Sequence, residues 1–76
     1  MGAMNEFKVL DPSGHSSSAW DPENSEELER ARRTYEALLR RGYRAFGIEK
    51  GGEGRAQERF DPHERQTLFV PRIHSG

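Results

Sequence analysis

The chain of 76 residues carries 12 lysine and arginine residues against 13 aspartate and glutamate residues, for a formal net charge of −1. A chain this short forms one domain with a small core, and its balanced charge excludes a general attraction to nucleic acid or to anionic membranes. With no cysteine and no apolar run near the ~20 residues of a membrane span, we expect a cytoplasmic protein without disulfides, thiolate metal sites or membrane contact.

The N-terminal part of the chain predicts a β-hairpin. Residues 1–3 precede a second methionine and are interpreted as a cloning scar, so the domain is expected to cover residues 4–70. Residues 6–10 alternate as a strand does, and the Asp-Pro-Ser-Gly turn at 11–14 sends the chain back through a second strand at 15–20. The three serines of this second segment leave one alternative open, a mobile loop.

Residues 22–42 carry the clearest pattern in the chain, that of an amphipathic helix. Asn24 with Glu27 three residues later indicates the start, and Gly42 indicates the end. The apolar stripe follows spacings of three and four and consists of Leu28, Ala31, Tyr35, Leu38 and Leu39. On the remaining surface, glutamates precede arginines by four residues in the pairs Glu26–Arg30, Glu29–Arg33 and Glu36–Arg40.

Three further strands are expected after the helix. Residues 43–50 alternate clearly, and the glycine-rich turn at 51–54 leads into a polar edge strand at 55–60. A final strand at 66–70 ends before proline, and residues 71–76 are expected to form a flexible tail.

This ββαβββ order predicts an α+β domain in which one amphipathic helix packs on one face of an antiparallel sheet of four to five strands. The order of the elements is similar to a β-grasp layout. The sheet residues expected to meet the helix stripe are Phe7, Val9, Phe46, Ile48, Phe60, Leu68 and Val70.

Several short motifs resemble those of small uncharacterised proteins of bacterial and phage genomes. These motifs are Asp11-Pro12-x-Gly14, Trp20-Asp21-Pro22, Arg41-Gly42-Tyr43-Arg44-Ala45-Phe46, Phe60-Asp61-Pro62 and Leu68-Phe69-Val70-Pro71. The resemblance implies an accessory protein associated with phages or mobile elements. It implies no activity, cofactor or site.

The motifs expected of an enzyme are missing. The glycines at 51–54 connect two predicted strands, whereas a phosphate-binding loop joins a strand to a helix. His15, His63 and His74 fall in turns or in the tail, without metal-ligand spacing. We therefore expect no enzymatic activity, no cofactor and no metal.

Arginine supplies ten of the 12 basic residues and is the compositional feature that best indicates a binding surface, because its planar guanidinium suits carboxylate and phosphate partners. The candidate partner-binding residues are Arg30, Arg33, Arg40, Arg44, Arg55, Arg59 and Phe60. Two alternatives stay open: the helix arginines bind nucleic acid, or neighbouring glutamates neutralise them and leave a solvated surface.

The resulting hypothesis is a non-enzymatic module for protein–protein interaction or self-association. A partner strand, or a second copy, would pair along residues 55–60 or along whichever strand lies at the sheet edge. Against this, the charges of Arg55, Glu58 and Arg59 can also serve to deter such pairing.

Overall fold

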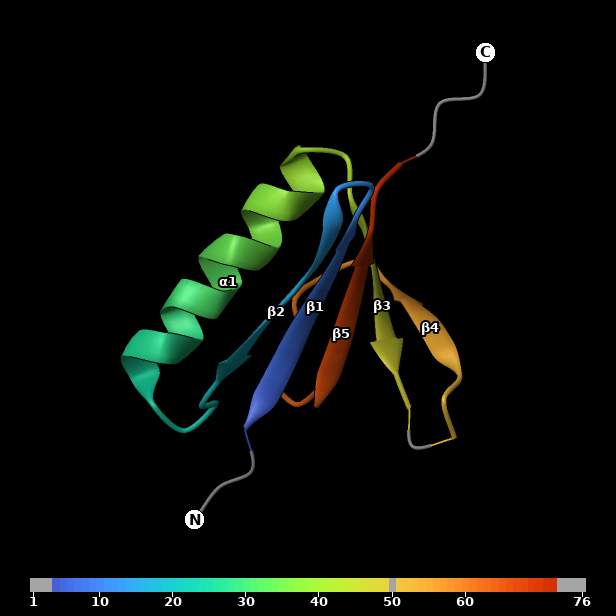
Figure 1. The fold of residues 1–76 in the computed structure, drawn as a ribbon. Coiled ribbons are helices and arrows are strands. Elements are labelled where there is room, and N and C mark those ends of the chain that lie inside the picture. The colour runs from blue at the N-terminus through green and yellow to red at the C-terminus, as the bar shows by residue number, and fades with distance from the viewer. Residues whose placement is uncertain (1–3, 50, 73–76) are drawn as a thin grey trace.

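The computed structural model describes residues 4–49 and 51–72, so the predicted cloning scar and residues 73–76 of the predicted tail lie outside the described residues. Figure 1 shows one helix on one side of a five-stranded sheet, and the predicted α+β class is confirmed. In chain order the elements are β1 (Asn5–Asp11), β2 (Gly14–Trp20), α1 (Ser25–Arg40), β3 (Arg44–Ile48), β4 (Gly54–Gln57) and β5 (Gln66–Val70).

The strands lie in the order β2-β1-β5-β3-β4, so β2 and β4 form the two edges of the sheet. All pairings are antiparallel except that between the central strands β1 and β5, which is parallel. This pair departs from the all-antiparallel sheet expected from the sequence. The physical reason is the 58–65 connection, which crosses the sheet instead of closing a hairpin, so that β5 enters in the direction of β1 (Figure 1).

The N-terminal hairpin is confirmed, since β1 and β2 pair from Asn5 opposite Trp20 to Asp11 opposite Gly14. The Asp11 carboxylate closes the turn by accepting hydrogen bonds from the Ser13 N–H at 2.9 Å and the Ser13 hydroxyl at 2.7 Å. The serine-rich segment is therefore a regular strand, and it delivers Trp20 to the core at its end.

Helix α1 begins and ends where its capping residues indicate. Asn24 is the N-cap, and its side-chain oxygen accepts from the backbone N–H groups of Glu26 at 3.0 Å and Glu27 at 3.2 Å. At the other end Gly42 takes a φ of +98°, and the Tyr43 N–H donates to the Leu38 carbonyl at 3.0 Å. The helix is shorter than the predicted 22–42 because both flanking segments serve as caps.

Aromatic side chains form the centre of the core. The rings of Phe7 and Phe69 lie 5.1 Å apart, and Phe7 lies 5.4 Å from Trp20. Tyr35 of the helix lies 5.6 Å from Phe69 and is 1% exposed. The helix stripe is confirmed, because Ala31, Tyr35 and Leu38 are buried while Leu28 and Leu39 pack against them.

The sequence predicted the wrong face of β3 and β5 for this core, because the buried residues lie one position away from the expected ones. The buried side chains that face the helix are Ala45 on β3 and Thr67 and Phe69 on β5. Because neighbouring residues of a strand point to opposite faces, the larger apolar residues of these strands lie on the other face of the sheet. Those residues are Phe46, Ile48, Leu68 and Val70.

The predicted edge strand at 55–60 was also wrong in its extent. Strand β4 covers only Gly54–Gln57, and Phe60 belongs to the connection that follows. The Phe60 ring is half-buried and lies 5.5 Å from Trp20 and 5.6 Å from Tyr35. The chain leaves the edge after Gln57 because this aromatic side chain is drawn into the core.

Candidate functional site

A groove separates the edge strand β2 from helix α1. It holds a hollow of about 190 Å³, which we call the β2–α1 groove. Its lining consists of Phe7, Ser18, Ala19, Trp20, Glu27, Arg30, Ala31 and Thr34. Phe7, Trp20 and Ala31 are at most 5% exposed and form an apolar floor, whereas Ser18 and Thr34 are exposed at the rim.

One flank of the helix supplies the charged rim of this groove. Glu27, Arg30 and Thr34 follow at spacings of three and four, which places them on the same side of α1. The Glu27 carboxylate accepts a hydrogen bond from the Asp21 N–H at 3.0 Å. Among the described residues, no carboxylate lies within ion-pair distance of Arg30. The rim therefore carries one negative and one positive side chain, and the Arg30 guanidinium is the one for which the described residues supply no hydrogen-bond or ion-pair partner.

Two buried polar groups of the aromatic core lack a hydrogen-bond partner within the described part of the chain, the Trp20 indole N–H and the Tyr35 hydroxyl. Burial raises the pKa of Tyr35 above its ordinary value of 10.0, since the charged phenolate is poorly solvated there. Such groups cost stability, so the aromatic core is held by packing rather than by polar contacts.

The two edges of the sheet differ in length and charge. Strand β2 has seven residues, none of them acidic, lysine or arginine, and all except Trp20 are exposed. Strand β4 has four residues and carries Arg55, which forms an ion pair with Glu49 at 2.8 Å. Long, uncharged edges accept an additional strand most readily, while charged side chains deter it. Of the two edges, β2 is the better suited to pairing.

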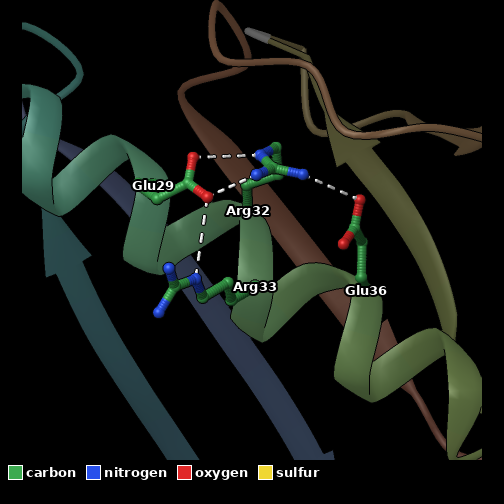
Figure 2. Close-up of polar contacts among 4 residues, drawn as sticks. All are labelled: Glu29, Arg32, Arg33 and Glu36. Atoms are coloured by element: carbon green, nitrogen blue, oxygen red, sulfur yellow. Dashed lines mark hydrogen bonds and ion pairs between the residues drawn. The ribbon is translucent and has the colours of Figure 1, made fainter.

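On the solvent side of the helix, acidic and basic side chains form one ion-pair network (Figure 2). Arg32 contacts Glu29 and lies 3.3 Å from Glu36, while Arg33 lies 3.6 Å from Glu29. The hydrogen bond from Arg32 lowers the pKa of Glu29. Arg32 was missing from the residues singled out in the sequence, although its spacing to both glutamates signals these contacts.

The predicted partner-binding residues do not form one surface. Arg30 lines the β2–α1 groove, Arg33 and Arg40 are exposed on the helix, and Arg44 lies on β3. At the opposite edge, Arg55 lies on β4, and Arg59 is exposed in the connection that follows. Phe60 packs in the core. Of the predicted set, only Arg30 lines the groove.

The sheet face turned away from α1 presents the apolar side chains that the core does not use. We call this the open face, and its larger apolar members are Leu10, Phe46, Ile48, Leu68 and Val70. The strand registers place Leu68 between Lys8 and Phe46 in one row. All five apolar residues are half-buried, so neighbouring side chains cover one another in part.

The turn between β1 and β2 lies beside the C-terminal end of the helix. The Tyr43 hydroxyl donates to the Asp11 carboxylate at 3.3 Å, and the Arg41 guanidinium lies 6.0 Å from the centre of the Tyr43 ring. Hydrogen bonds from Ser13 and then from Tyr43 lower the pKa of Asp11. This arrangement fixes the turn, and it offers no reacting pair of groups.

Within residues 4–49 and 51–72, no group of three or more histidine, cysteine, aspartate or glutamate side chains is arranged to hold a metal ion. His15 lies on β2 and His63 in the 58–65 connection, while His74 lies outside the described residues. In the same part of the chain, no helix is long and apolar enough to span a membrane. Comparison with known proteins gave no match to a protein-family model, a curated protein or a solved structure.

Proposed function

We propose that the protein is a non-enzymatic interaction module that binds a protein partner by pairing a strand with the edge of its sheet. The observation that carries the proposal is the edge strand β2, with seven residues and no acidic, lysine or arginine side chain. Its outer backbone groups have no partner strand among the described residues. A partner segment that supplies these hydrogen bonds gains affinity from the main chain and specificity from its side chains.

The open face adds a second contact surface to the same module. Its apolar side chains continue across β1, β5 and β3, and apolar surface of this kind is typical of binding sites. A partner strand at the edge would extend this surface and can cover part of it. Both features favour a binding role over a catalytic one, because catalysis needs convergent reactive groups in a cleft.

The alternative, nucleic-acid binding through the helix arginines, is less well supported by the charges. Phosphate binding needs arginines that are segregated from carboxylates. Arg32 and Arg33 are engaged with Glu29 and Glu36, and Arg55 is engaged with Glu49. Positive and negative side chains therefore alternate on the helix surface.

The resemblance of the short motifs to bacterial and phage proteins guides the choice of material for the test. We infer an accessory role associated with phages or mobile elements, in the cytoplasm of a bacterial host. The partner is therefore to be sought in lysates of phage-infected bacteria as well as in lysates of uninfected cells.

Affinity capture with two matched variants, Ser17→Lys and Ala56→Lys, tests the proposal. Both residues are exposed and lie in the same row of the open face, one on edge strand β2 and the other on edge strand β4. Lysine on an edge strand opposes pairing. We expect Ser17→Lys to abolish capture of a specific partner and Ala56→Lys to retain it.

Light scattering on the pure protein and its variants distinguishes a captured partner from self-association. A protein that stays monomeric, captures no specific partner and turns over a substrate in a metabolite screen would contradict the proposal. If only Ala56→Lys lost capture, the docking edge would be β4 instead of β2, and strand pairing would still be the mode of binding.

A further inference from the structure

We propose that the β2–α1 groove binds an extended segment of another protein that pairs with β2, places one apolar side chain in the hollow and presents a carboxylate to Arg30. This inference rests on the proposed function and specifies its ligand. It follows from the shape of the groove, the charge at its rim and the side chains that β2 itself carries.

The groove has the shape to receive one side chain of an added strand. A strand added to β2 lies about 4.8 Å beyond it and directs every second side chain toward the helix side of the sheet. On that side the hollow measures about 190 Å³ and has Phe7, Trp20 and Ala31 at its floor. An apolar cavity of about 150 Å³ accommodates a benzene ring. The groove therefore has room for one aliphatic or aromatic side chain.

Arg30 offers a binding position for a carboxylate at the rim of the groove. Arg30 lines the groove, is exposed and has no ion-pair partner among the described residues. Glu27 on the same rim keeps its negative charge, but its carboxylate is directed to the Asp21 N–H at 3.0 Å. On a strand, the next side chain on the same face lies about 7 Å away, two residues along. An aspartate or glutamate two positions from the apolar residue can thus reach the Arg30 guanidinium, which binds carboxylates in a planar fork.

A second copy of β2 does not fit the groove. The alternation that directs Trp20 toward the helix side also directs Gly14, Ser16 and Ser18 there. Trp20 is already buried in its own core, and the other three are too small to fill the hollow. Strand β2 contains no aspartate or glutamate to pair with Arg30. The groove therefore fits a strand of different sequence.

Peptide titrations test this inference, with Trp20 as reporter because it is the one tryptophan of the chain and lines the groove. The probes are extended peptides of about nine residues, rich in threonine and valine so that they favour a strand. One position carries leucine or serine, and the position two residues along carries aspartate or lysine. We expect the leucine–aspartate peptide to change the fluorescence at the lowest concentration.

Two charge-reversal variants provide the matched comparison. Arg30→Glu should weaken binding of the aspartate peptide by about tenfold or more and favour the lysine peptide. Arg33→Glu makes the same change of charge on a neighbouring exposed arginine outside the groove, and it should alter the affinity much less. Circular dichroism of both variants confirms that the fold is retained.

Backbone pairing is tested with N-methylated peptides. One peptide carries methyl groups on its odd-numbered amides and another on its even-numbered amides. One of the two should lose binding and the other should retain it, because only one edge of the added strand faces β2. The inference would be overturned if Arg30→Glu and Arg33→Glu changed the peptide affinity equally. It would also be overturned if the affinity depended neither on the aspartate nor on the methylation of the peptide. If no peptide binds while Ser17→Lys still abolishes capture of a partner, the groove inference fails and the proposed function stands.

Discussion

Phe60 offers the sharpest test of the packing, because the sequence assigns it both to the core and to a partner-binding surface, while the structure packs it against the core. Its ring lies 5.5 Å from Trp20, 5.6 Å from Tyr35 and 6.4 Å from Phe7. Removal of a fully buried phenylalanine side chain costs about 3–5 kcal/mol, and each aromatic pair contributes roughly 0.5–1.5 kcal/mol beyond its buried area. Since Phe60 is half-buried, we expect Phe60→Ala to cost about 2–4 kcal/mol.

That cost is large for this domain. With 76 residues the free energy of unfolding is expected to be roughly 4–11 kcal/mol, so the variant should lose a substantial fraction of it. Urea unfolding followed by Trp20 fluorescence measures the change, and thermal unfolding should show the midpoint lowered by roughly 10 °C or more. The control is Arg59→Ala, an exposed neighbour whose change should stay within about 0.5 kcal/mol. A Phe60→Ala variant as stable as this control would refute the packing of the 58–65 connection onto the core.

Leu38→Ala should destabilise the domain by about 2–5 kcal/mol in urea melts, because Leu38 is 8% exposed in the helix stripe, and a change below about 0.5 kcal/mol would exclude it from the core. Tyr35→Phe removes a buried hydroxyl that has no partner among the described residues, so it should be neutral or stabilise the domain by about 1 kcal/mol. Because burial raises the pKa of Tyr35, its contribution to stability is present below pH 10.0 and is lost as the pH rises through the folded pKa. The stability of Tyr35→Phe should not show this loss at alkaline pH. The pKa values of Asp11 and Glu29 are lowered from 3.8 and 4.5, so the stability that these carboxylates contribute is present above those values and is lost as the pH falls through the lower folded pKa values. In acid titrations, Asp11→Asn should therefore lose stability less steeply than the parent protein. No salt-sensitive complex with short DNA is expected at about 150 mM salt, and one that Arg33→Glu abolishes would revive the nucleic-acid alternative.

Local chemistry made much of the fold predictable. Asn24 and Gly42 determine the ends of the helix through side-chain and backbone hydrogen bonds within a few residues, and the structure shows both caps. The turn from Asp11 to Gly14 likewise sets the register of the hairpin through neighbouring atoms. Such signals are readable in a sequence because the partners are close along the chain.

The face that a strand buries is not readable in the same way. On β3 the larger alternate residues, Phe46 and Ile48, predict the core face, yet Ala45 is buried instead. Ala45 lies beside Phe69 of the neighbouring strand β5, and the buried Phe69 ring lies 5.6 Å from that of Tyr35 on the helix. A small side chain on β3 suits a core layer that already holds these large rings. Volume complementarity of this kind depends on residues far apart in sequence.

The candidate site was likewise predictable from the sequence only in part. Arg30 was predicted as a partner-binding residue from its place on the helix and was expected to pair with Glu26, but the structure shows no ion pair between these two described residues. The groove itself arises because β2 is an edge strand beside α1, which depends on the order of strands in the sheet. Local patterns do not determine that order.

We propose that the free edge of β2 is the docking edge of an interaction module. The most direct measurement is amide hydrogen exchange, residue by residue, on the free protein and on its complex with the captured partner. We predict that alternate amides of residues 14–20, those that point away from β1, become strongly protected in the complex, while the amides of β4 exchange as before. Unchanged exchange along β2 in a saturated complex would contradict the claim.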